Sequence, residues 1–306
     1  MTVVSDRPDP PASPPRARAP RRRLGGARAG SLLGAVPFLA YVAVFLIIPT
    51  LVVVVGAFAG DGGFTWSNVA ALGEGYILDA FARSVALSAV TAVIGAVLGA
   101  VLAYALVTAR PGGPLRRAVT AASGVLAQFG GVTLAFAFVA TIGLSGFVTV
   151  FLRDHLGVDL YAGGVWLFEL PGLALVYTYF QVPLMVIVFL PALDGIRPQW
   201  REATESLGGS TWQYWTRVAG PLLAPAFLGS TLLLFANAFS AYATAAALVS
   251  QGNPIVPLQI RGALTSEVVL GQQNLGKAMA LGMVVVVAVV MTGYTLLQRR
   301  TARWLG

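Results

Sequence analysis

The stretch Asp194-Gly-Ile-Arg-Pro-Gln-Trp-Arg-Glu-Ala-Thr-Glu-Ser-Leu-Gly208 is rich in charge and lies between two long apolar blocks. Nine further residues lead from Gly208 to Val218-Ala-Gly-Pro221. Two apolar segments that only had to be joined inside a membrane would need no more than a turn. The charges and the glycine hinge therefore suggest that the loop over 194–220 contacts something soluble.

The composition places the rest of the chain in a lipid bilayer. Of its 306 residues 57% are hydrophobic and only 10% are charged, the mean hydropathy is +0.78, and there is no cysteine. A soluble domain needs more charge to cover its surface, and here the apolar residues form long uncharged blocks. We expect an all-α integral membrane protein.

Six intervals between charged residues are long enough to cross the hydrocarbon, which takes roughly 20 apolar residues. The fifth interval is long enough for two spans, but Gly252, Asn253, Pro254 and Pro257 interrupt its second half, which predicts an irregular loop or a short re-entrant piece there. The six predicted spans cover about 33–58, 84–108, 119–145, 171–191, 222–249 and 278–298.

The basic residues predict the orientation of these spans. If the N-terminus is cytoplasmic, 16 of the 20 Lys and Arg residues fall on the cytoplasmic side, including the group at 197–217. Both termini are therefore expected inside. Residues 1–30, rich in Pro and Arg, predict a disordered basic tail held near anionic lipid rather than a nucleic-acid-binding segment. Residues 31–306 form the expected six-helix membrane domain.

No catalytic, cofactor or metal motif is complete. The run from Gly271 to Ala278 resembles a phosphate-binding loop but has Ala278 where Ser or Thr should bind magnesium. Ser145 stands in an incomplete nucleophile-elbow pattern, and His155, the only histidine, is predicted to lie in a polar loop without a metal-ligand partner. We therefore expect a subunit that is not an enzyme.

Polar residues inside the spans are candidates for a solute passage, although hydrogen bonding between helices is the other reading for each of them. Gly95 and Gly99 predict a close helix contact, and Pro183 predicts a kink. No acidic residue lies well inside a span, which argues against an ion-coupled carrier. The candidate passage residues are Gln128, Gln181, Asn237, Ser240, Tyr242 and Thr244.

The loop over 194–220 resembles the EAA loop in the permease subunits of binding-protein-dependent type I ABC importers. That pattern is Glu-Ala-Ala, three residues, Gly, nine residues, a branched aliphatic residue, any residue and Leu-Pro. Here Glu202-Ala-Thr, Gly208 and Val218-Ala-Gly-Pro221 keep the spacing, with Thr204 in place of Ala and Gly220 in place of Leu. The resemblance covers roughly residues 80–300.

The resemblance implies that this loop contains a cytoplasmic coupling helix between the fourth and fifth spans. It implies two copies of a cytoplasmic ATP-binding subunit, a second permease of the same or another chain, and an extracytoplasmic solute-binding protein, all at a bacterial plasma membrane. The residues it assigns to contact with the ATPase are Arg201, Glu202, Ala203, Thr204, Leu207, Gly208 and Pro221.

Local patterns give the loop a conformation independently of the family. Pro198 favours the start of a short helix, in which Arg201 and Glu205 are spaced to pair and Trp200, Ala203, Thr204 and Leu207 share a face. Gly208 favours a left-handed end, with a second helix beginning near Thr211 and carrying Trp212, Trp215 and Val218 on its apolar side. An amphipathic helix lying on the membrane surface is the alternative.

The solute is less well defined by the sequence. The segments around 193–203 and 239–248 look like the importer branch for polyamines, ferric iron, thiamine or phosphonates, and within it we expect a polyamine or similar small cation. Ferric iron, thiamine or a phosphonate is the alternative. A secondary transporter and a membrane scaffold remain as other classes, and co-purification of an ATPase would separate them from an importer.

Overall fold

The computed structural model describes residues 36–60, 62–109, 113–249, 255–265 and 272–302. The chain divides after Leu51 into two parts, which are described separately. In the first part the helix described from Val36 onward contains a π-helical turn, η1 (Ala43–Ile47), and most of its apolar side chains are exposed. The same helix continues as α2 (Ile48–Ala57) into the second part. The predicted tail over 1–30 lies outside the described residues.

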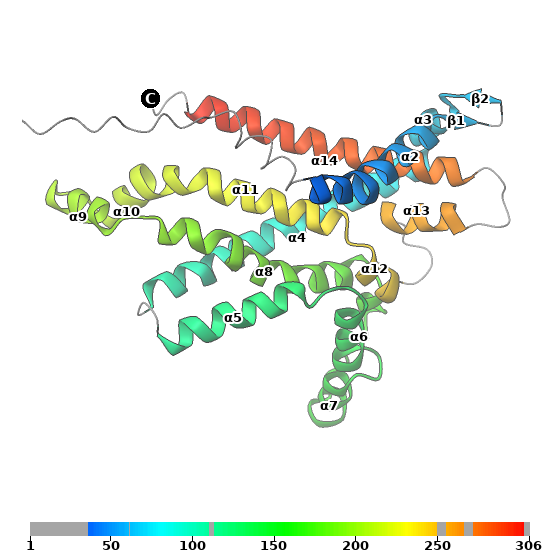
Figure 1. The fold of residues 1–306 in the computed structure, drawn as a ribbon. Helices are drawn as coiled ribbons and strands as arrows, with labels where there is room; N and C mark the ends of the chain where they lie inside the picture. The colour runs from blue at the N-terminus through cyan, green and yellow to red at the C-terminus, as the bar shows by residue number, and fades with distance from the viewer. Residues whose placement is uncertain (1–35, 61, 110–112, 250–254, 266–271, 303–306) are drawn as a thin grey trace, which may run out of the picture. The chain divides into compact units, whose positions relative to one another are not determined.

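Three long helices form the centre of the second part: α4 (Gly75–Thr108), α8 (Leu170–Asp194) and α11 (Gly220–Phe239). Figure 1 shows them side by side, with α5 (Pro114–Gln128) along α8. Apolar residues surround each of the three helices, as expected for helices buried in protein or lipid. Their shared core contains Ala96, Met185, Val186, Leu234 and Phe239.

The tightest contact in this core joins α4 to α8. A β-carbon added at Gly95 would lie 2.7 Å from the β-carbon of Gln181, and one added at Gly99 would lie 2.5 Å from that of Met185. Only glycine lets the two backbones approach so closely. The predicted small-residue contact at Gly95 and Gly99 is therefore confirmed.

The remaining elements cover the end of the bundle at which α4 begins. Two short strands, β1 (Ala59–Gly60) and β2 (Gly63–Phe64), form an antiparallel pair in which Ala59 lies opposite Phe64. They are followed by α3 (Ser67–Ala70) and η2 (Ala71–Gly73). Nearby, α13 (Val256–Thr265) packs on α14 (Gln272–Ala302), and both help to enclose Ile77 and Ala80 of α4.

Among the described residues, six helices are long and apolar enough to span a membrane, in agreement with the predicted number. Their bounds are Val36–Ala57, Gly75–Thr108, Gly131–Leu156, Leu170–Asp194, Thr211–Phe239 and Gln273–Leu296.

Two predicted spans differ from the structure because they are interrupted. The span expected over 119–145 is broken at Phe129–Gly130, so that α5 is followed by α6 (Gly131–Ile142) and α7 (Phe147–Leu156). Figure 1 shows α6 and α7 turning away from the direction of α5 and α8. The span expected over 222–249 ends at Phe239, and α12 (Ala243–Leu248) follows after a short break.

The loop expected near 252–257 is only partly described. Gly252, Asn253 and Pro254 lie outside the described residues, whereas Pro257 is the second residue of the helix α13. A proline is tolerated there because the N–H groups of the first helical turn have no partner inside the helix. Where it is described, the second half of the fifth interval contains the short helices α12 and α13, in the place where we predicted an irregular loop or a short re-entrant piece.

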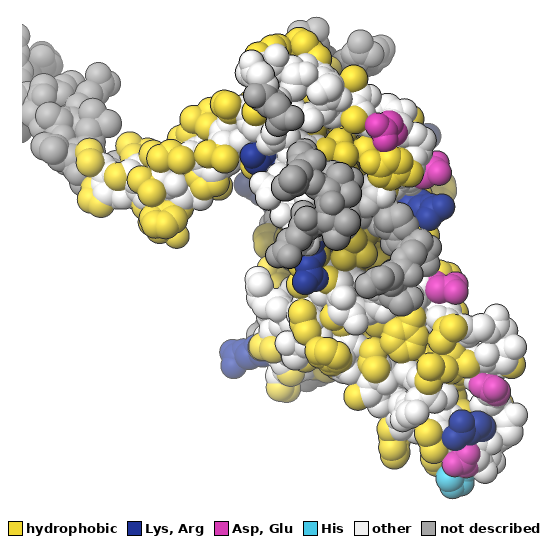
Figure 2. All heavy atoms as spheres, turned by 90° about the vertical axis from the view of Figure 1, so that its right-hand side faces the viewer, with side chains coloured by type: hydrophobic (Ala, Val, Ile, Leu, Met, Phe, Trp, Pro, Cys, Tyr) yellow, Lys and Arg dark blue, Asp and Glu magenta, His cyan; other side chains and the backbone are white. Residues whose placement is uncertain are grey.

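The outer surface of this fold is largely apolar. Figure 2 shows hydrophobic side chains over much of the visible face and only scattered charged groups. Val97 and Val101 on α4 and Val284 on α14 are at least half exposed within the chain. Apolar side chains in such positions are stable in contact with lipid or with another protein chain.

Candidate functional sites

The charged loop folds as two short helices joined at an elbow, which we define as residues 197–219. The first helix is α9 (Pro198–Ser206), with Pro198 at its first position. Gly208 has φ +76° and an added β-carbon there would meet nothing within 4 Å, so this glycine is required for its backbone conformation alone. The second helix, α10 (Thr211–Tyr214), follows at the predicted place.

A reciprocal cap fixes the start of α10. The hydroxyl of Ser210 accepts a hydrogen bond from the N–H of Gln213 at 3.3 Å, and Oε1 of Gln213 accepts one from the N–H of Ser210 at 2.8 Å. This capping box satisfies two backbone donors that a helix end leaves unpaired. Together with Gly208 it holds the two helices at a defined angle.

The charges on α9 point to solvent. Nε of Arg201 lies 2.9 Å from Oε1 of Glu205, as the spacing predicts, and this hydrogen bond raises the pKa of Arg201. Glu202 is exposed, and its carboxylate has no ion pair within the described part of the chain. A free carboxylate on a rigid, solvent-facing helix can bind a basic group of another protein.

The predicted apolar face of α9 is only partly turned inward. Trp200 and Thr204 are half-buried, but Ala203 is exposed and Leu207 is 89% exposed. On the second helix Trp212, which we predicted on the apolar side, is 76% exposed. Large exposed apolar side chains beside charges are typical of binding surfaces. Trp212 is thus a candidate contact residue that helical periodicity alone did not identify.

The elbow continues into α11 through a π-helical turn, η4 (Trp215–Ala219). The N–H of Gly220 donates to the carbonyl of Trp215, five residues earlier. Pro221 lacks an N–H, and its ring would clash with the carbonyl four residues before it in a regular α-helix. The wider turn explains how the helix tolerates Pro221, and π-bulges are frequent at functional sites.

The elbow is anchored to the bundle by two contacts. The ring of Trp215 packs edge-to-face on Tyr104 of α4, with centroids 5.3 Å apart. At the start of the loop, Nη2 of Arg116 on α5 donates to both carboxylate oxygens of Asp194, at 2.8 and 2.6 Å. A force on the elbow would therefore be transmitted to α4, α5 and α8 as well as to α11.

A small pocket lies where α11 ends, beside the middle of α8 and the start of α12. It has a volume of about 270 Å³ and is enclosed by α6, α8 and the break between α11 and α12. Four predicted passage residues line it: Asn237, Ser240, Tyr242 and Thr244. We call it the amide pocket. The glycines Gly130 and Gly131 also line it, which the sequence analysis did not anticipate.

The other two predicted passage residues lie elsewhere. Gln128 is exposed at the end of α5, next to Ala127, which does line the amide pocket. Gln181 is fully buried between α8 and α4, where its Nε2 donates to the hydroxyl of Thr91 at 2.9 Å and its Oε1 has no partner. Gln181 thus forms a hydrogen bond between two helices and is not among the residues that line the amide pocket.

One hydrogen bond ties the amide pocket to the bundle. The hydroxyl of Tyr177, a fully buried residue of α8, donates to the backbone carbonyl of Ala241. Ala241 lies in the break between α11 and α12, where regular helix hydrogen bonds are interrupted. The tyrosine thus satisfies one backbone acceptor of the break and fixes the pocket wall.

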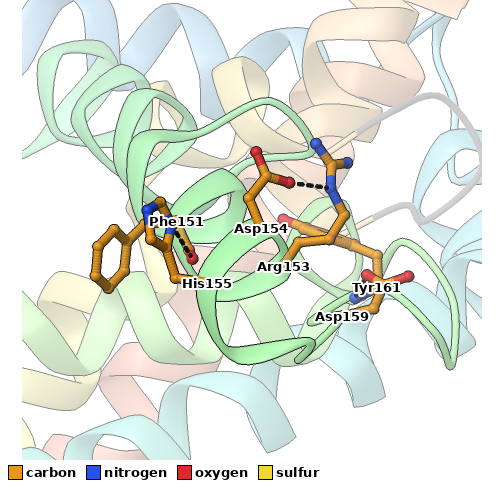
Figure 3. A network of polar contacts seen from close by, with 6 residues as sticks. All are labelled: Phe151, Arg153, Asp154, His155, Asp159 and Tyr161. Atoms are coloured by element: carbon orange, nitrogen blue, oxygen red, sulfur yellow. Dashed lines mark hydrogen bonds and ion pairs between the residues drawn. The ribbon is translucent and has the colours of Figure 1, made fainter.

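The polar groups around His155 form a local structure rather than a site. We predicted His155 in a polar loop, but it belongs to the last turn of α7. Its Nδ1 lies 3.2 Å from the carbonyl oxygen of Phe151, and its ring stacks on the ring of Phe151 (Figure 3). Asp154 pairs with Arg153, and Asp159 accepts the backbone N–H of Tyr161. Within the described residues there is no group of three or more side chains suited to bind a metal ion.

The segment that resembles a phosphate-binding loop is helical where it is described. Residues from Gln272 onward belong to α14, and Nζ of Lys277 donates to the side chain of Asn274 at 3.0 Å. A phosphate-binding loop needs successive backbone N–H groups that are free to face the anion. The N–H groups of Gly276, Lys277 and Ala278 follow the first turn of α14 and are bonded within the helix, so they cannot face an anion.

Comparison with known proteins identifies the family. Residues 156–305 match the model of the "Binding-protein-dependent transport system inner membrane component" family. The ferric transport system permease protein of Actinobacillus pleuropneumoniae is 27% identical over 62% of this chain, and the sulfate transport system permease protein of Escherichia coli is 29% identical over 37% of it. The chain spans 27% of the first relative's length and 36% of the second's.

Solved structures share the fold. A bacterial ABC transporter involved in the import of the acidic polysaccharide alginate aligns over 90% of this chain and 96% of its own, with a TM-score of 0.73 and 17% identity. The MetNI methionine ABC transporter aligns over 72% of this chain and 93% of its own, with a TM-score of 0.53. The family match, the shared fold and the six apolar helices place this chain among the permease subunits of type I binding-protein-dependent ABC importers, as a multi-pass protein of the bacterial plasma membrane.

Proposed function

We propose that this chain forms the passage for a small solute and couples its movement to ATP hydrolysis in a separate subunit. The observation that carries the proposal is the elbow, a charged and solvent-facing helix pair at one end of the bundle. The amide pocket lies deeper in the bundle, beside the middle of α8. We propose that the elbow lies in the cytoplasm together with both termini, because most basic residues fall on that side.

The elbow would bind in a groove of the ATP-binding subunit. Glu202 would pair with a basic residue there, and the exposed Leu207 and Trp212 would supply apolar contact area. The remaining residues proposed for this interface are Arg201, Ala203, Thr204, Gly208 and Pro221. Because Arg201 is already paired with Glu205, it would stiffen α9 rather than compete for Glu202.

The movement would reach the solute pocket through the bundle. Closure of two ATP-binding subunits would shift the elbow, and the contacts of Trp215 and Asp194 would transmit this shift to α4, α5 and α8. Two of these helices reach the amide pocket: α5 through Ala127 and α8 through Phe180. In addition, Tyr177 of α8 donates to the carbonyl of Ala241 in the pocket wall. The other proposed partners are a second permease, of the same or another chain, and an extracytoplasmic solute-binding protein.

The solute class follows from the pocket and the relatives. Among the described residues, no acidic side chain lines the amide pocket, so these residues offer no negative charge to neutralise a polyamine. The relatives are named for ferric iron, sulfate and molybdenum transport. We therefore propose an inorganic anion, or a metal ion such as ferric iron carried in an anionic complex, ahead of the polyamine that the sequence suggested.

The test compares two charge reversals at opposite ends of the bundle. Glu202→Lys should abolish co-purification of the ATPase subunit and solute uptake, since reversing one partner of a charged hydrogen bond costs at least about 1.5–3 kcal/mol, more than tenfold in affinity. The matched control is Glu74→Lys, which reverses an exposed carboxylate at the start of α4. Normal ATPase binding by the Glu202 variant would refute the proposal and favour a secondary carrier or a scaffold.

A further inference from the structure

A second pocket adjoins the amide pocket and shares Ser240 and Tyr242 with it. Its volume is about 410 Å³, and apart from these two residues it is enclosed mainly by α13, with Met283 of α14. Ile260 and Leu264 give it an apolar wall.

Arg261 is the charged side chain among the residues that line this second pocket. It is exposed, and its guanidinium carbon lies 5.8 Å from the centre of the Tyr242 ring. Within the described residues no carboxylate forms an ion pair with it. A cation held over an aromatic face keeps its planar N–H groups available at the rim, where they match the spacing of two oxyanion oxygens.

We propose that the second pocket binds the oxyanion group of the transported solute at Arg261, so that this site selects anionic solutes, or metal ions carried in anionic complexes, over free cations. The inference rests on the proposed function and narrows its solute class. The apolar wall strengthens the attraction because charges interact more strongly next to low-dielectric surroundings. A polyamine would be repelled by the same guanidinium.

The first experiment measures binding without transport. The purified chain in dodecyl maltoside, which contains no phosphate, is treated with phenylglyoxal, and the modification rate of each arginine is read from its peptide by mass spectrometry. Sulfate is the probe, and chloride at equal ionic strength is the reference. We expect sulfate above its Kd to slow the modification of Arg261 at least about threefold. Arg83, exposed on α4 outside both pockets, is the internal control.

Two variants test the role of the aromatic face. Tyr242→Phe keeps the ring under the guanidinium and should keep the protection by sulfate. Tyr242→Leu removes the ring and should reduce it. A second series replaces sulfate with dispersed phosphatidylglycerol: stronger protection by lipid than by sulfate would assign the site to a lipid headgroup and overturn the proposal. Equal modification rates in sulfate and chloride would overturn it as well.

The second experiment measures uptake of labelled sulfate, molybdate, ferric citrate and spermidine by cells that express the complete importer. Arg261→Gln should lower uptake of the transported anion at least about tenfold at subsaturating concentration. Arg261→Lys should lower it less, because lysine keeps the charge but cannot form the bidentate hydrogen bonds of a guanidinium. Unchanged anion uptake by the Gln variant, with uptake still abolished by Glu202→Lys, would refute this inference alone. Unchanged uptake by the Glu202 variant would refute the proposed function.

Discussion

The side chain of Arg116 near the start of α5 bridges both carboxylate oxygens of Asp194, the last residue of α8, at 2.8 and 2.6 Å. The two residues are 78 positions apart, and the pair is only partly exposed, with Arg116 at 20% and Asp194 at 42%. It closes the end of the bundle immediately before the elbow. The ion pair is thus placed to set the position at which the elbow leaves α8.

Asp194→Asn should loosen this end without unfolding the protein. A partly exposed ion pair contributes about 0.2–1 kcal/mol, so the apparent Tm in detergent should fall by only a few degrees. Proteolytic cleavage within 195–210 should become faster. Asp154→Asn is the matched control because its partner, Arg153, is its neighbour in sequence and the pair joins no separate elements. Equal cleavage of wild type and the Asp194 variant would show that the pair does not position the elbow.

Gly208→Ala should impair coupling through backbone strain. The left-handed conformation at φ +76° destabilises an alanine by roughly 1 kcal/mol relative to glycine, although its β-carbon would meet no atom within 4 Å. Gly157→Ala introduces the same strain at φ +63°, also in open space, at the end of α7. We therefore expect the two variants to lose similar stability but only the Gly208 variant to lose solute-dependent ATPase activity. Equal loss of activity in both would assign the effect to general destabilisation.

Gln181→Leu and Asn237→Leu should have different effects, because one residue is sealed between helices and the other lines the amide pocket. The buried Oε1 of Gln181 has no hydrogen-bond partner, and such a group costs about 1–3 kcal/mol. Thr91 retains its hydrogen bond to the carbonyl of Leu87 when the amide is removed. The Gln181 variant should thus be at least as stable as wild type, with near-normal uptake.

Asn237→Leu should instead lower uptake while leaving the Tm nearly unchanged, since Asn237 is exposed to the pocket. Uptake rates and melting curves of both variants in the same membranes provide the comparison. If Gln181→Leu lowered uptake as much as Asn237→Leu, Gln181 would have to be counted among the residues of the solute passage.

The elbow could be predicted in detail because its signals are local. Pro198, the spacing from Arg201 to Glu205, and Gly208 each specify backbone geometry within a few residues, and the structure follows all three. The number of long apolar helices was predictable for a similar reason, since the hydropathy of a continuous segment requires no knowledge of its neighbours.

The interruptions at Phe129–Gly130 and after Phe239 were not predictable from charge intervals, because neither contains a charged residue. Gly130-Gly131 was the only local signal for the first. In the break after Phe239 the carbonyl of Ala241 accepts a hydrogen bond from Tyr177, a residue 64 positions away that charge intervals cannot identify. The same holds for Arg261 of α13: no sequence motif predicts that its guanidinium lies over the ring of Tyr242, the residue before α12.

The predicted orientation of the membrane spans can be tested with reporter fusions. In Figure 1 the C-terminal end of α14 and the start of α5 lie at the same end of the bundle as the elbow, whereas the loop after α7 lies at the other. We expect green fluorescent protein to fluoresce when fused after residue 303 or inserted within 110–117, because it folds only in the cytoplasm. Alkaline phosphatase inserted at Gly163, which is exposed and has open space around it, should be active because it needs an oxidising exterior. Active phosphatase at 110–117 would place the elbow outside the cell, where no ATP-hydrolysing subunit could reach Glu202.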